Sequence, residues 1–125
     1  MPKRVDAIVR KTLRMILEAS RDMHPREFGA ILRAEEGTIT ELLLLPGTVS
    51  GERHAVFQFH MLPADFSVVG TIHSHPNGVL EPSDEDLRLF SKFGGVHIIV
   101  GHPYSEGSWA GWTYAGERIP LRVVS

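Results

Sequence analysis

Two histidines separated by one residue stand in the part of the chain that is richest in potential ligands. His73 and His75 come at the end of an apolar stretch, and beyond a short loop follow Ser83 and Asp86. If the strand expected here extends to His75, both imidazoles project to the same face, because side chains alternate along a strand. The residue types therefore indicate either a metal site or a polar loop that connects a strand to a helix.

A third metal ligand would have to be an oxygen or nitrogen donor. The chain contains no cysteine, which excludes a thiolate metal site and a disulfide framework. Catalytic zinc usually has three protein ligands and leaves its fourth position to water. Asp86 is the best oxygen candidate, because a helix that begins at Ser83 would place Asp86 in its first turn, facing the loop that carries the histidines.

The serine and the aspartate also have a purely structural interpretation. Ser83 and Asp86 have the spacing of a capping box, in which a serine and an acid satisfy the first amides of a helix. Acids in a first helical turn are favoured by the helix dipole by about 0.3–1 kcal/mol each, without any further function. The combination of a histidine pair, a Pro-Asn-Gly loop and a serine–acid pair is nevertheless much rarer than any of its parts.

The elements that must position these residues follow from hydrophobic spacing. Apolar residues from Val5 to about Arg21 recur with helical period, and Pro25 ends this helix. Two strands are expected around a turn at Glu36-Gly37, and the leucine run 42–45 should be buried on both faces. Further strands are expected over 56–62, 66–73, 96–101, 108–116 and 118–124, with a helix from Ser83 to about Phe93 that Gly94-Gly95 stops.

Few helices and many strands predict the α/β (α+β) class, with a mixed sheet and helices packed on it. Trp109 and Trp112 stand three apart in an expected strand, so they should face opposite sides of the sheet. His102 follows a buried strand and could approach the candidate site. The other histidines outside the motif have no partners at ligand spacing.

Composition and charge limit the function classes. The 125 residues suffice for one domain with a real core, and we expect residues 1–125 to form it. The net charge is −2 and the basic residues are scattered, so no nucleic-acid partner is expected. No apolar run has the length needed to span a bilayer and no secretory signal is recognisable, so we expect no membrane association and a cytoplasmic location.

The motif resembles that of the JAMM, or MPN+ (JAB-type), metalloproteases: His-x-His, seven residues, a serine, two residues and an aspartate. HSHPNGVLEPSDED has this spacing. The family also has a glutamate after its first helix, at the start of a strand, and HPREFGAIL supplies Glu27 there. The resemblance extends over nearly the whole chain, and GTIHSHP and PSDEDLRLF look like compact archaeal members. It implies a mixed, curved sheet flanked by helices, similar to the cytidine deaminases.

The resemblance implies a role for each candidate residue. His73, His75 and Asp86 would bind one Zn²⁺ per chain, which would polarise the scissile carbonyl and lower the pKa of a water. Glu27 would take the proton from that water and later give it to the leaving amine, and Ser83 would donate a hydrogen bond to the oxyanion. The implied substrates are peptide or isopeptide bonds after the C-terminal glycine of ubiquitin-like modifiers or sulfur-carrier proteins.

Other interpretations stay open at this point. A non-catalytic MPN scaffold or a RadC-like protein of DNA metabolism would share parts of the pattern, although scaffold members lack the metal residues. Iron, cobalt or nickel would also suit a ligand set of two histidines and one aspartate. Deamination is disfavoured, because zinc deaminases need cysteine ligands. The oligomeric state is open, with a homodimer as one alternative.

Overall fold

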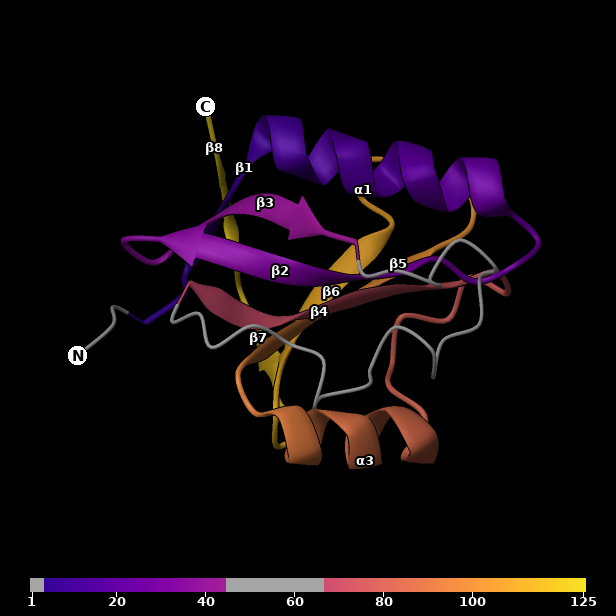
Figure 1. The fold of residues 1–125 in the computed structure, drawn as a ribbon. Helices are drawn as coiled ribbons and strands as arrows, with labels where there is room; N and C mark the ends of the chain where they lie inside the picture. The colour runs from indigo at the N-terminus through magenta and orange to yellow at the C-terminus, as the bar shows by residue number, and fades with distance from the viewer. Residues whose placement is uncertain (1–3, 45–66) are drawn as a thin grey trace.

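The computed structural model describes residues 4–44 and 67–125, and in them a mixed eight-stranded sheet carries one helix on each face (Figure 1). Along the sheet the strands have the order β7-β6-β5-β4-β2-β3-β1-β8. The strands are β1 Ala7–Val9, β2 Gly29–Glu35, β3 Thr38–Leu43, β4 Val68–His75, β5 Val96–Gly101, β6 Trp109–Thr113, β7 Arg118–Ile119 and β8 Arg122–Val124. The helices are α1 Arg10–Met23 and α3 Asp84–Phe93. The predicted class, a mixed sheet flanked by helices, is confirmed.

Strand β4 lies at the centre of the sheet and carries both histidines. It pairs antiparallel with β2 and parallel with β5, which places His73 opposite Gly29 on one side and Ile99 on the other. Ile72 belongs to the core that α1 covers, whereas the ring of His73 lies against Phe90 of α3. Because side chains alternate, His73 and His75 project to the same face of β4, as the sequence predicted, and that face is the one that α3 covers.

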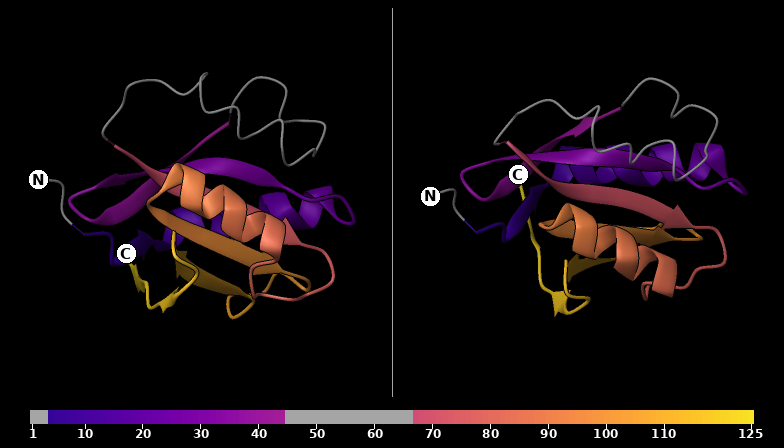
Figure 2. Two further views of the ribbon diagram at one scale, coloured as in Figure 1. Left: turned by 90° about the horizontal axis from the view of Figure 1, so that it is seen from below. Right: turned by 60° about the horizontal axis from the view of Figure 1, so that its bottom comes forward.

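The two helices cover opposite faces of the sheet, as the views from below also show (Figure 2). Helix α1 buries the residues Thr12, Leu13, Ile16, Leu17 and Ser20. Phe90 of α3 packs against Ile99, Ala110 and Trp112 on the other face. Trp109 packs against the core under α1, so the two tryptophans face opposite sides, as their spacing predicted.

Local signals located several boundaries correctly. Glu36 and Gly37 have positive φ angles of 50° and 81° and form the turn between β2 and β3. Ser83 is the N-cap of α3 and Gly94, with φ 76°, is its C-cap. No helix in the described parts of the chain is long and apolar enough to cross a membrane.

Three expectations about elements are wrong. The first helix begins at Arg10 and not at Val5, because Ala7–Val9 form strand β1 between β3 and β8. The leucine run is not buried on both faces where it is described: Leu42 and Leu43 are half-buried and Leu44 is 56% exposed.

The third error concerns the last expected strand, 118–124. It is divided at Pro120 into β7 and β8, which pair with β6 and β1 at opposite edges of the sheet. Proline lacks an amide hydrogen and interrupts a ladder, so the chain leaves one edge there and joins the other. The strand expected over 56–62 lies outside the described residues.

Candidate metal centre

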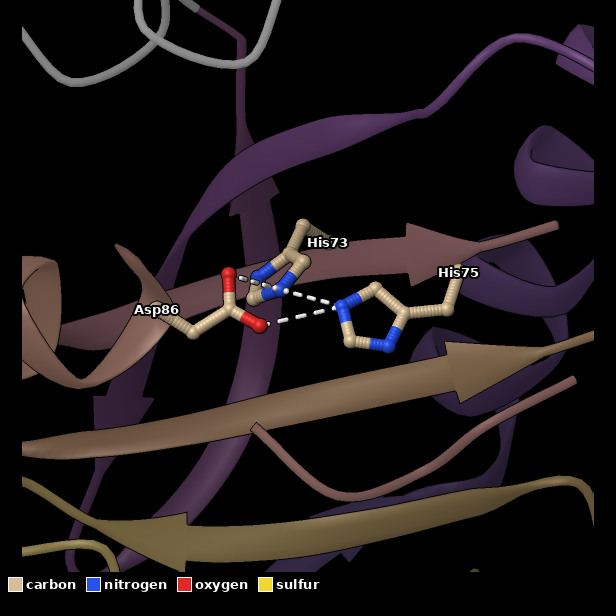
Figure 3. Close-up of side chains that lie close together, drawn as sticks. All are labelled: His73, His75 and Asp86. Carbon is tan, nitrogen blue, oxygen red and sulfur yellow. Dashed lines mark hydrogen bonds and ion pairs between the residues drawn. The ribbon is translucent and has the colours of Figure 1, made fainter. Parts of the chain in front are cut away.

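Three side chains from two elements converge between β4 and α3 (Figure 3). His73 Nε2 lies 3.1 Å from Asp86 Oδ1, and His75 Nε2 lies 3.1 Å from Asp86 Oδ2. The two Nε2 atoms are 3.2 Å apart, and the candidate ligand atoms all lie within 4.8 Å of one another. His73, His75 and Asp86 are therefore positioned to bind a single metal ion.

The protonation of His75 explains why a cation suits this position. His75 Nδ1 lies 2.8 Å from the backbone oxygen of Val79, and because a carbonyl only accepts, Nδ1 must carry a proton there. In neutral His75 the other nitrogen, Nε2, then presents its lone pair to the carboxylate of Asp86. Two acceptors that face each other repel unless a cation lies between them. The contact with Val79 also orients the ring, as outer partners do in metal sites.

The first turn of α3 holds the carboxylate in place. The amide of Asp86 donates to Ser83 Oγ at 3.1 Å, and the amide of Ser83 donates to Asp86 Oδ2 at 2.9 Å, which completes a capping box. The predicted cap therefore exists, and the same Oδ2 atom that it fixes also faces His75. The capping box and the position of Asp86 as a candidate metal ligand are therefore compatible, because they occur in the same arrangement of the two side chains.

The electrostatics of the cluster favour an ionised carboxylate next to the imidazoles. Burial alone would raise the pKa of Asp86, but the hydrogen bonds that its carboxylate accepts when the facing imidazole nitrogens of His73 and His75 carry protons hold it well below its ordinary value. Burial alone would lower the pKa of His75, but its hydrogen bonds and the charges of Asp86 and Glu27 raise it. Protons and a metal ion compete for the same imidazole nitrogens, so metal binding should weaken as the pH falls.

The two remaining candidates, Glu27 and Ser83, line a cavity beside this cluster. The cavity has a volume of about 510 Å³ and is lined by Glu27, His75, Pro76, Asn77, Val79, Glu81, Pro82 and Ser83. Glu27 comes from the segment between α1 and β2, far from the motif in sequence, and its charge acts on His75. All five candidate residues thus lie in one region of the molecule.

Sequence reasoning missed the backbone groups that support His75. The Val79 carbonyl that orients its ring carries no signal in the sequence, because any residue could supply it. His102 does approach the site, but through its amide, which lies 3.4 Å from the backbone oxygen of His75. Its ring stacks on that of His24, with centroids 4.8 Å apart, and does not join the ligand cluster.

Comparisons with known proteins identify relatives over nearly the whole chain. The family model for prokaryotic homologues of the JAB domain matches residues 9–114. A protein of Haloferax volcanii, described as a probable metalloprotease, is 42% identical over 132 aligned residues, which cover 98% of this chain and 81% of that protein.

Two solved structures are similar in both sequence and fold. A JAB1/MPN domain protein from Archaeoglobus fulgidus is 41% identical with a TM-score of 0.78, over 95% of this chain and 99% of that chain. A structure described as JAMM, a metalloprotease-like zinc site in the proteasome and signalosome, is 39% identical with a TM-score of 0.78, over 97% and 99% of the two chains.

Proposed function

We infer the function from one premise: the chain belongs to the JAMM/MPN+ family, among the prokaryotic homologues of the JAB domain. Its relatives described as a probable metalloprotease and as a zinc site support a hydrolase of the metalloprotease type. The proposed reaction is zinc-dependent hydrolysis of the peptide or isopeptide bond after the C-terminal glycine of a ubiquitin-like modifier or a sulfur-carrier protein. The observation that carries this proposal is the convergence of His73, His75 and Asp86 beside a cavity that also presents a carboxylate and a hydroxyl.

The proposed division of labour follows from the position of each group. His73, His75 and Asp86 would hold the zinc ion, which when bound polarises the scissile carbonyl and lowers the pKa of a water molecule. Glu27 accepts a proton from the attacking water as the new C–O bond forms, and delivers it to the leaving amine as the C–N bond breaks. Glu27 suits this role because it lines the cavity next to His75 but lies outside the three-residue ligand cluster.

Ser83 is the proposed donor to the oxyanion that develops on the carbonyl. Its Oγ atom already accepts the amide of Asp86, so its own proton is left to donate. Because the capping box holds Ser83 in place, little reorganisation is needed when charge develops on the substrate.

The size of the cavity supports an extended substrate segment. A volume of about 510 Å³ is that of a small-molecule site and not of a groove for a folded domain. A flexible tail could bring its scissile bond to the cluster, and a tail that ends in glycine has the smallest side chains to accommodate. A ubiquitin-like modifier or a sulfur carrier offers such a tail.

Replacing Glu27 by Gln tests the proton-transfer role. We expect Glu27→Gln to keep its zinc and to lose about 10²-fold or more in kcat, because the base is removed and the ligands remain. The assay uses zinc-loaded protein with a linear fusion and a lysine-linked conjugate of a glycine-ended β-grasp modifier. Glu81→Gln is the matched control, since it removes another carboxylate that lines the same cavity.

The same assay distinguishes the ways in which the proposal could fail. An active Glu27→Gln variant would contradict the assignment of the base alone. Conjugates that stay intact with zinc-loaded wild-type protein would contradict the substrate class. If wild-type protein also binds no zinc, a non-catalytic MPN scaffold becomes the better interpretation.

A further inference from the structure

We propose that Ser74 is a positioning residue that holds Glu27 in place relative to the metal ligands. This inference rests on the proposed function, because Glu27 is the group that is positioned. Ser74 lies between His73 and His75 on β4 and is completely buried. Since side chains alternate along a strand, its hydroxyl points away from the ligand cluster, toward the face of the sheet that α1 covers.

Two hydrogen bonds connect Ser74 to the residue next to Glu27. The amide of Phe28 donates to Ser74 Oγ at 2.8 Å, and the amide of Ser74 donates to the backbone oxygen of Phe28 at 2.9 Å. Strand β2 begins only at Gly29, so the hydroxyl extends the pairing of β2 with β4 by one residue. The segment that carries Glu27 is thereby attached to β4 between the two histidines.

The surroundings of this hydroxyl are otherwise apolar among the described residues of the same core. Ile72, which faces the same side of β4, belongs to an apolar core with Ile98 and Val100. A buried hydroxyl is unfavourable in such surroundings unless it is hydrogen-bonded, and a β-branched apolar residue would suit a buried strand better. The bond with the buried amide of Phe28 explains why a serine is present there.

The attachment matters because Glu27 lies outside any helix or strand. It stands between the end of α1 at Met23 and the start of β2 at Gly29, so its position relative to the ligands depends on how this connecting segment is attached to the sheet. A displacement of about 1 Å at a reacting group can cost about 10²-fold in rate. Loss of the hydroxyl would leave the amide of Phe28 without this partner and would let the Glu27 segment shift.

A matched pair of variants isolates the hydroxyl. Ser74→Thr and Ser74→Val have the same shape and differ only in a hydroxyl against a methyl group. We expect Thr to keep most of the wild-type kcat, and Val to lower kcat by about 10- to 100-fold. KM and the zinc content should be unchanged in both variants, because neither substitution touches a ligand. The substrate is the glycine-ended modifier conjugate, and zinc is measured by elemental mass spectrometry.

Amide hydrogen exchange gives a readout that does not depend on turnover. Exchange at Phe28 should be faster in Ser74→Val than in Ser74→Thr, because only Thr can accept its amide. Ser20→Ala is the control: Ser20 is equally buried, on α1, and its removal should change neither kcat nor exchange at Phe28. A purely structural role for Ser74 would instead lower the melting temperature and the zinc content together.

Each result decides one question. If wild-type protein is active and the Ser74→Thr and Ser74→Val variants have equal kcat values, the positioning role of Ser74 is overturned and the proposed function stands. This holds whether the two values are both high or both low. Wild-type protein that holds zinc and cleaves no conjugate would overturn the proposed function, and this inference with it. A kcat that falls only in the Ser74→Val variant, with zinc retained, supports both the proposed function and the positioning role of Ser74.

Discussion

At the scale of single residues, Ser83 is a helix cap and also the proposed oxyanion donor, so one hydroxyl group would serve both purposes. Its oxygen accepts the amide of Asp86, which stabilises the start of α3 and holds a ligand. Its proton is available to the cavity that Glu27 also lines. In the proposed mechanism, stability and catalysis depend on different atoms of the same side chain, and a substitution should affect both.

Replacing Ser83 by Ala should lower kcat by about 10²–10³-fold, the cost of one oxyanion donor. It should also lower the free energy of unfolding by about 1 kcal/mol, because the cap is lost. Steady-state kinetics and urea denaturation measure the two effects separately. Ser91→Ala is the control, since Ser91 is an exposed serine of the same helix whose hydroxyl donates to the backbone oxygen of Arg88 one turn away. A loss of stability with kcat unchanged would reduce Ser83 to a helix cap.

At the scale of elements, Tyr104 links the end of α1 to the segment after β5. Its side chain is only 2% exposed, and its hydroxyl lies 2.6 Å from His24 Nδ1. Its backbone oxygen accepts a hydrogen bond from Arg21 at 2.8 Å. Because only Pro25 and Arg26 separate His24 from Glu27, this link holds the α1–β2 segment on the N-terminal side of Glu27, whereas Ser74 holds it at Phe28.

Removing the tyrosine hydroxyl tests this link. Tyr104→Phe should lower the free energy of unfolding by about 1 kcal/mol, the net value of one hydrogen bond, and should leave the zinc content unchanged. Tyr114→Phe is the control, because Tyr114 is 56% exposed and should give no measurable change. Equal stability of the two variants in urea denaturation would show that the bond with His24 contributes nothing.

The elements that sequence analysis located were those with local signals. The spacing of His73 and His75, the capping box of Ser83 and the turn at Glu36-Gly37 all involve residues within a few positions of one another. Their physical causes, the alternation of a strand and the satisfaction of free amides, act over the same short range. The candidate ligands could therefore be identified before the structure was known.

The elements that sequence analysis missed depend on distant partners. Strand β1 continues the apolar spacing of α1, and only its parallel pairing with β3 and β8 shows it to be a strand. The expected strand 118–124 is divided at Pro120 because β7 pairs with β6 at one edge of the sheet and β8 pairs with β1 at the other. The sequence does not show which strands lie next to these edges. The contact between Ser74 and Phe28 joins residues 46 positions apart, and that between His24 and Tyr104 joins residues 80 positions apart. No local pattern predicts such contacts.

At the scale of the whole molecule, a buried histidine connects the sheet to α3. His97 of β5 is completely buried, with Nδ1 2.6 Å from Thr71 Oγ1 and Nε2 2.7 Å from the backbone oxygen of Gly94. Its ring stacks on Phe90 with centroids 4.0 Å apart. Burial lowers the pKa of His97 from 6.5 to about 4, although the hydrogen bond to Gly94 opposes this shift. The fold therefore requires the neutral imidazole.

This requirement predicts how stability depends on pH. Between pH 4 and 6.5, His97 binds a proton in the unfolded chain but not in the folded chain. The contribution of neutral His97 to the free energy of unfolding is therefore complete above pH 6.5, and it is lost as the pH falls to about 4. The shift corresponds to at most about 3 kcal/mol. His97→Gln does not titrate, so the difference in unfolding free energy between metal-free wild type and this variant should grow with pH across that window. A constant difference would contradict the neutral assignment.

The central claim is that His73, His75 and Asp86 bind one zinc ion, and elemental mass spectrometry tests it most directly. The measurement compares wild type with Asp86→Asn and with Asp84→Asn, which removes a neighbouring acid from the same helical turn. We predict about one zinc ion per chain in wild type and Asp84→Asn, and almost none in Asp86→Asn, because a neutral amide is a poor zinc ligand. Wild-type protein that stays empty after zinc is supplied, or an Asp86→Asn variant that keeps its zinc, would contradict the account.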